Sequence, residues 1–542
     1  MKMISQGTTV RIARGSTFGM LRDTLNLGRD KVLAEYNGEL FGMGREIPDA
    51  GEVRWWSIHS KYGFQAYQRT LVLLLAYAIY RMHNKKLGVE VKHSMGSSLY
   101  CEFTDKHVPL KKEMADITRE MHQIIQEKVP LTEHVVAREP ELEKLALSVF
   151  GKDQQKKINK IKKSMHVYSC GTCYDCFLGA LLPDFSYIKE FSLSPYAPGF
   201  LLHCHNAKTG TGEKEGEAMY ARVFLEAQEW GERIGCKNVW ELNHAIEEGK
   251  AFRLISIAEA LQEKKLAWLA DSIAFSRPGI RMVCMAGPSS SGKTTFMNRL
   301  IVQLWVNGIK PVTISLDDYY REHPPVSPGN KENYENLDAL DVPLFHRVIS
   351  GLLEGRAMRI PHFNFKTGKR EWSAQEVKLG DKQPVLVEGL HALNPELTNF
   401  VPGYQCMHIF LSALTQLSID RHNRISTSDT RLVRRIVRDS WARNNTPDDT
   451  LSAWANVQQG ERKNIFPFQG RADVVFNTAL IYELPVLRTM AIPLLKKVKP
   501  ESPNYGEARR LIDFLHLFDT IDCSLVPDRS LLREFIGGGK LV

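Results

Sequence analysis

An eight-residue run, Gly287-Pro-Ser-Ser-Ser-Gly-Lys-Thr294, constrains the fold of this chain more than any other feature, because it reads G-x-x-x-x-G-K-T. An apolar run at 282–286 precedes it with the length of a buried strand, and apolar residues at helical spacing follow it as far as Gly308. A strand, a glycine-rich loop and a helix N-terminus together surround one anion with backbone N–H donors and the positive end of a helix dipole. The context therefore predicts a phosphate-binding loop rather than a flexible Ser/Gly-rich segment.

The residue types in this loop predict how it would hold a nucleoside triphosphate and its metal. Lys293 would reach the β- and γ-phosphates, and the Thr294 hydroxyl would bind Mg²⁺. ATP and Mg²⁺ are therefore the expected cofactors. The expected nucleotide contacts within the loop and the first turn of the helix are Gly287, Ser289, Ser290, Ser291, Gly292, Lys293, Thr294 and Thr295.

Length and composition describe an ordinary water-soluble protein. At 542 residues the chain exceeds what one core holds, which predicts roughly two to four domains. No apolar stretch approaches the ~20 residues that a membrane helix needs, and the first residues do not resemble a signal peptide, so we expect a cytoplasmic protein without a membrane partner. The net charge of +9 suits an anionic ligand such as a nucleotide and equally suits weak binding to RNA.

Cysteine usage points away from disulfides and leaves a metal site open. The nine cysteines are an odd number in a large chain, which argues against a disulfide framework. Cys170, Cys173 and Cys176 form C-x2-C-x2-C, a spacing that suits tetrahedral Zn²⁺, but a fourth ligand is not evident. A zinc site and three reduced thiols are both compatible with this pattern.

The pattern of apolar residues divides the chain into four parts. Residues 1–57 alternate in short runs around an Asn37-Gly38 turn, as in a small β-rich domain, whereas 58–275 mix helices with a strand-rich stretch at 165–205. The break at Ser276-Arg-Pro-Gly279 places a boundary before residues 276–500. Residues 501–542 read as a C-terminal helical tail that packs on the preceding domain.

Apolar strands alternate with helices throughout 276–500, which predicts an α/β fold: a parallel sheet with helices on both faces. Ligands of such sheets gather at the carboxyl ends of the strands. The expected strands are 281–286, 311–316, 384–388 and 406–411.

Acidic residues follow two of these strands. Asp317 and Asp318 come after 311–316, and one of them can accept a proton from an attacking hydroxyl or hold Mg²⁺ while the other caps or pairs. Glu388 ends the strand 384–388 and suits a second acidic group that orients Mg²⁺. The predicted metal site therefore consists of Thr294, Asp317 and Glu388.

Four arginines lie on one face of a predicted helix. Their spacing is i, i+3, i+4 and i+7, and the positions are Arg431, Arg434, Arg435 and Arg438. Such a face is either solvated or part of a mobile lid over the triphosphate that excludes water, so that transfer outcompetes hydrolysis. The scarcity of acidic neighbours on this helix favours the lid, with Arg431 and Arg434 stabilising charge on the transferred group.

The block 281–491 resembles the uridine kinase and phosphoribulokinase family of P-loop kinases. The likeness rests on GPSSSGKTT (287–295), ISLDDYY (314–320), NYENLDALD (333–341), IPHFNFKTGKRE (360–371), VLVEGLHALNP (385–395) and SDTRLVRRIVRD (428–439). With 412–426, 461–477 and 531–538, it is nearest to a bacterial branch of long, multidomain uridine kinase-like proteins. This resemblance implies ATP-dependent phosphoryl transfer to the 5′-hydroxyl of a nucleoside such as uridine or cytidine.

Matched position by position, the resemblance implies that Asp317 is the base and Tyr320 an aromatic neighbour. Tyr334 and Glu335 match the pair that holds the sugar, and Phe363 and Phe365 match the aromatics that sandwich the base. Gly368 stands where uridine kinases carry a His that reads the pyrimidine edge. This departure keeps two alternatives open: a kinase for another nucleoside or a phosphosugar, and a nucleotide-switched RNA-binding regulatory protein.

The N-terminal half resembles parts of threonyl-tRNA synthetases. Residues 1–57 are similar to a TGS domain, a small β-grasp module, and 60–205 to the editing domain, on the strength of 93–103 and 168–191. The editing enzyme needs an H-x3-H pair and a C-x3-H pair. The helix 66–83 has no H-x3-H, and Phe177 and Leu181 replace the second pair, so we expect no editing zinc site. RNA binding, ligand binding, regulation and an oligomer interface stay open for this half, and a homo-oligomer is expected.

Overall fold

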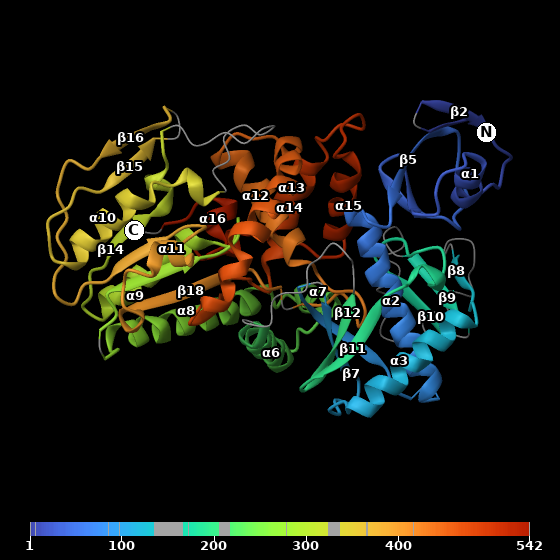
Figure 1. The fold of residues 1–542 in the computed structure, drawn as a ribbon, viewed down its shortest axis with the longest axis horizontal. Coiled ribbons are helices and arrows are strands. Elements are labelled where there is room, and N and C mark those ends of the chain that lie inside the picture. Colours follow the sequence, from blue (N-terminus) through green and yellow to red (C-terminus); the bar gives the residue numbers. More distant parts are fainter. Residues whose placement is uncertain are drawn as a thin grey trace.

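The structure is a computed structural model that describes residues 2–540 except 6, 85, 97, 135–165, 172, 205–216, 278, 323–335, 365–366 and 416. Figure 1 shows the N-terminal sheet at the right and the parallel sheet with its helices at the left. The helices α12–α15 lie between them. Among the described residues, no helix combines the length and apolarity that crossing a bilayer requires.

The N-terminal unit is a small mixed sheet with one helix, α1 (Phe18–Thr24), packed on it. Its strand order is β2-β1-β5-β3-β4, in which β1 and β5 run parallel. The strands are β1 (Lys2–Ser5), β2 (Thr8–Arg11), β3 (Lys31–Tyr36), β4 (Glu39–Gly42) and β5 (Gly51–Ser57). Asn37 and Gly38 join β3 to β4 with φ of 51° and 74°, as a tight hairpin requires. The expected β-rich unit is confirmed.

The middle region combines two antiparallel sheets with the helices α2 (Lys61–Met82) and α3 (Lys111–Gln126). One sheet has the order β11-β12-β7-β6 and the other β10-β9-β8. The strands are β6 (Val89–Met95), β7 (Ser98–Phe103), β8 (Leu131–His134), β9 (His166–Cys170), β10 (Cys173–Phe177), β11 (Phe191–Tyr196) and β12 (Gly199–Cys204). Phe177 and Leu181, which replace the editing pair, are each only 1% exposed and serve the core of this region.

The helices α6 (Glu217–Ile234), α7 (Val239–Glu247) and α8 (Ala251–Ala274) come next along the chain. Leu254 and Ile273 of α8 share a core with Phe296 of α9. Arg299 of α9 is buried and donates to Glu263 of α8 at 2.9 Å. The boundary expected at 275/276 would therefore cut through one core, and we propose that the division lies before α6 instead.

The C-terminal part is built on a parallel sheet with the order β14-β17-β13-β18-β19. Side chains of the central strand alternate, so that Met282 and Cys284 join one core while Val283 and Met285 join another. The strands are β13 (Met282–Ala286), β14 (Val312–Ser315), β17 (Val385–Glu388), β18 (Cys406–Ser412) and β19 (Val474–Asn477). The α/β fold and its expected strands are confirmed. The strand β19 adds an edge that the sequence patterns had not indicated.

Helices and a hairpin complete the C-terminal part. The hairpin is β15 (Pro361–Asn364) and β16 (Lys369–Trp372). The helices are α9 (Lys293–Val306), α10 (Val342–Leu353), α11 (Pro395–Thr398), α12 (Thr427–Ala442), α13 (Pro447–Asn464), α14 (Glu483–Leu495), α15 (Tyr505–Leu515) and α16 (Arg533–Ile536). In the tail, α15 packs on α14 and also reaches the N-terminal half, where Glu507 accepts hydrogen bonds from Lys61 at 3.0 Å and Tyr62 at 3.1 Å.

Candidate active site

The loop between β13 and α9 has the backbone geometry that its glycines predict. Gly292 has a φ of +87° at the residue before α9, a conformation that favours glycine. A Cβ on Gly287 would lie 2.4 Å from the Leu411 carbonyl oxygen of the neighbouring strand. Both positions therefore need glycine, one for its conformation and the other for a close approach to β18.

Several donors of this loop have no partner, or only a partner within the loop. Ser290 and Ser291 are 3% and 0% exposed, and their hydroxyls have no hydrogen bond to any described residue. The Lys293 ammonium donates to the carbonyls of Gly287 at 2.9 Å and Pro288 at 3.4 Å. Buried hydroxyls without partners and a lysine folded back on its own loop fit a site that receives a phosphate group.

Two glutamates already accept from backbone N–H groups at this site. The Ser289 N–H donates to Glu461 of α13 at 2.8 Å, and the Thr295 N–H donates to Glu534 of α16 at 3.1 Å. The tail also packs on the loop, because a Cβ on Gly292 would meet Leu531 at 2.7 Å. A carboxylate at a helix N-terminus takes the place that an anionic ligand favours, so a phosphate group would compete with Glu534.

Asp317 and Glu388 lie at the carboxyl ends of neighbouring strands beside the loop. Asp317 belongs to the short 3₁₀ turn η4 (Leu316–Tyr319) after β14, and Glu388 is the last residue of β17. Burial raises the pKa of the Glu388 carboxyl to about 7, with Lys293 opposing this effect and Asp317 adding to it. Desolvation by the surrounding protein likewise raises the pKa of Asp317, and Lys293 again opposes the shift. The three groups therefore act on one another, as expected for one site.

The neighbouring carboxylate, Asp318, has a positioning role. It pairs with His362 at 2.9 Å and accepts a hydrogen bond from the Phe363 N–H at 3.1 Å. Both contacts tie η4 to β15. This arrangement agrees with the expectation that one of the adjacent aspartates faces the site while the other pairs.

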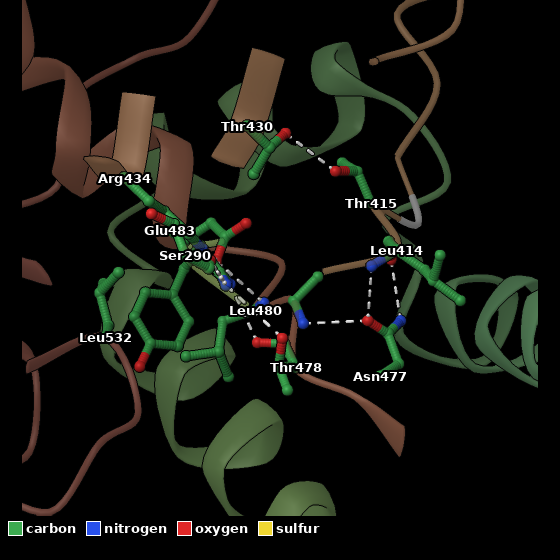
Figure 2. A network of polar contacts seen from close by, with 12 residues as sticks. Ser290, Leu414, Thr415, Thr430, Arg434, Asn477, Thr478, Leu480, Glu483 and Leu532 are labelled. Atoms are coloured by element: carbon green, nitrogen blue, oxygen red, sulfur yellow. Dashed lines mark hydrogen bonds and ion pairs between the residues drawn. The ribbon is translucent and has the colours of Figure 1, made fainter. Parts of the chain in front are cut away.

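Arg431 and Arg434 of α12 are buried behind the loop. They are 4% and 0% exposed; Arg431 pairs with Glu461 at 2.8 Å, and Arg434 pairs with Glu483. Arg431 also donates to the Ser289 carbonyl at 3.0 Å, and Arg434 to the Ser290 carbonyl at 3.3 Å. Figure 2 shows Arg434 and Glu483 beside Ser290. The expected mobile lid is wrong for these two arginines, because buried ion pairs fix them against the loop.

Two other arginines of α12 contact the loop and Asp439. Arg435 donates to the Ser289 hydroxyl at 2.8 Å, and Arg435 and Arg438 pair with Asp439 at 3.2 Å and 2.7 Å. The charges of Arg443 and Asp317 act on each other: Arg443 lowers the pKa of the Asp317 carboxyl. Arg443 lies one residue beyond the end of α12, after the four arginines of the helical pattern, and was not among the predicted site residues.

The sequence profile of the Phosphoribulokinase / Uridine kinase family matches residues 282–481, which contain the loop, both acidic groups and α12. Residues 282–481 belong to the phosphoribulokinase/uridine kinase family. The match begins at the first residue of β13 and ends before α14. The family domain therefore holds Glu461 but not Glu483 or Glu534, so residues outside it brace and cover its phosphate loop.

Curated relatives fall on both halves of the chain. A uridine kinase from Deinococcus deserti is 28% identical over 197 residues, which is 36% of this chain and 86% of the relative. A threonine–tRNA ligase from Natranaerobius thermophilus is 28% identical over 196 residues, 36% of this chain and 30% of that ligase, and this match fits the N-terminal part. Among solved structures, that of a possible uridine kinase from Bacillus stearothermophilus has 21% identity and a TM-score of 0.27, covering 40% of this chain and 98% of its own.

The substrate side of the family domain departs from the expected arrangement. Phe363 is 1% exposed and packs edge-on against Tyr320, with ring centroids 6.0 Å apart. The structure thus places Phe363 in the core, which corrects the expected sandwich around a base, and Tyr320 is likewise buried. Gly368 lies in the β15–β16 turn with a φ of +66°. Tyr334, Glu335 and Phe365 lie outside the described residues.

The cysteine-rich stretch offers no metal site among the residues that the structure describes. Cys170 and Cys173 face each other across the β9–β10 hairpin, and burial raises the pKa of both thiols. Cys176 lies further along β10, opposite Val167 of β9. In the described part of the chain, three side chains that could bind one metal ion lie close together in the parallel sheet: Cys284, Cys406 and His408. Cys170 and Cys176 are buried and Cys173 is partly buried, and none of the three forms a disulfide.

Proposed function

We propose that this protein is an ATP- and Mg²⁺-dependent kinase that phosphorylates a hydroxyl of a small alcohol, with the 5′-hydroxyl of a nucleoside as the leading acceptor. The observation that carries this proposal is the mutual influence of Lys293, Asp317 and Glu388 at the mouth of a phosphate-binding loop. A loop that only binds a nucleotide needs no carboxylate positioned to receive a proton.

ATP with Mg²⁺, when bound, supplies the phosphoryl group. The backbone N–H groups of Ser289 and Thr295 would bind the phosphates once their hydrogen bonds to the Glu461 and Glu534 carboxylates break. Lys293 turns from the loop carbonyls and neutralises charge on the transferred group.

On the acceptor side, Asp317 takes the proton from the attacking hydroxyl, and its raised pKa makes it a stronger base than an ordinary aspartate. Thr294, exposed in the first turn of α9, and Glu388 would hold the metal. Arg435, Arg438 and Arg443 gather around Asp439, and Arg435 contacts the Ser289 hydroxyl, so this positive group favours binding of the triphosphate.

The relatives named uridine kinase support a nucleoside acceptor. A second candidate, another small alcohol such as a phosphosugar, is favoured by Gly368, because a glycine in a hairpin turn presents no side chain that could read a pyrimidine edge. These candidates share the phosphate chemistry and differ only in what the acceptor side recognises.

Release of ADP by the purified full-length protein tests the proposal. ATP and Mg²⁺ are held constant while uridine, cytidine, purine nucleosides, ribose 5-phosphate and other sugars are supplied singly. We expect at least one acceptor to raise ADP release above the rate with water alone. If uridine and cytidine are inactive while another alcohol is phosphorylated, the second candidate is correct; if no acceptor raises turnover, the kinase proposal fails.

A further inference from the structure

A cavity of about 240 Å³ lies where three parts of the chain meet, away from the phosphate-binding loop. Its walls come from α2, from residues 178–180 after β10, from residues 419–429 at the start of α12, and from α15. The tip of the β3–β4 hairpin closes one side. The proposed kinase chemistry makes no use of this space.

Arginines dominate the charge of the cavity wall. The four guanidinium groups belong to Arg69, Arg424, Arg509 and Arg510, against the carboxylates of Glu39, Asp429 and Asp513. Arg510 forms two hydrogen bonds with Asp429, at 2.9 Å and 2.8 Å. Asp513 and Glu39 both act on the charge of Arg509. The two histidines of the wall already have acidic partners: His166 pairs with Glu133, and His422 with Asp175.

These pairings leave two guanidinium groups without a hydrogen bond to a carboxylate of the described residues. Arg69 donates two hydrogen bonds to the Ala180 carbonyl oxygen, at 3.2 Å and 2.9 Å. No hydrogen bond or ion pair joins the Arg424 side chain to another described residue, and the charge of Asp429 acts on it without such a contact. Desolvation lowers the pKa of both side chains, to about 10 for Arg69. Both guanidinium groups are partly buried, and a desolvated cation without a hydrogen-bonded anion is unfavourable, so the cavity favours a negatively charged occupant.

The rest of the wall suits an organic body attached to that charge. Gln65 and Gln68 of α2 contribute amide groups, and Val72, Leu99 and Phe514 contribute apolar surface. A volume of about 240 Å³ suits a ligand of the size of a sugar phosphate. Two guanidinium groups without a hydrogen-bonded carboxylate match the double negative charge of a phosphate monoester better than the single charge of one carboxylate.

We propose that this cavity is a binding site for a small phosphate monoester, with the phosphate held between Arg69 and Arg424. The site is distinct from the phosphate-binding loop and does not depend on the proposed kinase activity. Its wall includes Asp429 in the first turn of α12, and Arg431 and Arg434 of the same helix hold the loop. Occupancy therefore connects the N-terminal half with the helix that supports the active site.

Calorimetric titration of the full-length protein with ribose 5-phosphate tests this assignment. Lys293→Ala protein is used throughout, so that binding at the phosphate loop does not contribute. We expect binding of ribose 5-phosphate, none of ribose, and at least ~10-fold weaker binding in Arg424→Gln. Arg424→Lys should recover part of the loss, because it restores the charge without the planar fork.

Arg421→Gln is the matched control, since Arg421 is an exposed arginine three residues away on the same segment. It should bind ribose 5-phosphate as well as the parent protein does. The proposal is overturned if ribose 5-phosphate does not bind, if Arg424→Gln and Arg421→Gln bind it equally, or if succinate binds more tightly. These outcomes are independent of ADP release, so a failed kinase assay leaves the cavity test intact.

Discussion

Asp317 and Glu388 have similar surroundings but different proposed tasks. Both carboxyls are desolvated and face Lys293, yet Asp317 sits on the 3₁₀ turn after β14 whereas Glu388 ends the neighbouring strand β17, where it accepts a hydrogen bond from Ser315 at 3.1 Å. Only their positions on the fold distinguish the proposed proton acceptor from the proposed metal ligand. The sequence alone pointed to both residues because each lies at the carboxyl end of an apolar strand.

Asp317→Asn should lower kcat by ~10²–10⁴ with little change in ATP affinity, because it removes a proton acceptor and leaves the loop intact. Steady-state ADP release with the best acceptor, together with ATP titration, measures both quantities. Asp381→Asn, an exposed aspartate in a distant turn, is the control and should behave as the wild type. Unchanged turnover in Asp317→Asn would remove this residue from the mechanism.

Glu388 predicts a pH dependence of stability. Its pKa is about 7 in the folded protein against an ordinary value of 4.5, so between these values the folded state keeps a proton that the unfolded state loses. The contribution of this group to the free energy of unfolding is therefore mostly present at pH 5 and is lost as the pH rises through 7, with a total loss of roughly 3 kcal/mol. Urea unfolding of wild type and Glu388→Gln at pH 5 and 8, without Mg²⁺, should show this loss in wild type alone. An equal change in the free energy of unfolding between pH 5 and pH 8 in the two proteins would contradict the assignment.

At the scale of elements, the helix α12 shows where a sequence pattern is ambiguous. The spacing of Arg431 and Arg434 is the same for a mobile lid and for a buried brace. What distinguishes them is the position of the acidic partners, and Glu461 and Glu483 lie 30 and 49 residues further along the chain. The strands and the loop could be predicted because patterns of neighbouring residues indicate them. An ion pair between helices could not be predicted, because its two residues lie far apart in the sequence.

The tail element α16 predicts an effect on nucleotide binding. Because the Glu534 carboxylate accepts from the Thr295 N–H, it competes with phosphate and repels it. Glu534→Gln should tighten ATP binding by about fivefold, which corresponds to about 1 kcal/mol for a charge at a helix N-terminus. Equilibrium ATP titration measures this change. Glu501→Gln, an exposed glutamate earlier in the tail, should leave the affinity unchanged. Weaker ATP binding in Glu534→Gln would show that the carboxylate assists the site instead.

At the scale of the whole molecule, the contacts of the tail and of α8 went beyond what the sequence could predict. Periodicity showed that α8 has an apolar side but not which element covers it. The break in composition at 276–279 is a weak sign of a domain boundary, because α7 and α8 before it share one core with α9 and α14. Local composition locates turns, and only packing shows which turns separate domains.

Two truncated chains test whether the domain boundary lies at 275/276 or before α6. A chain of residues 276–542 loses α7 and α8, and with them the partners of Arg299 and the apolar side chains that share a core with α9. The apolar face of α9 would then contact water, at a cost of about 25 cal/mol for each Å² exposed. Residues 217–542 keep these contacts. We therefore expect 217–542 to be soluble with a cooperative melting transition, and 276–542 to be aggregated or to melt at least ~10 °C lower. Equal melting temperatures for the two fragments would restore the boundary at 275, since α8 would then contribute nothing to the core that it covers.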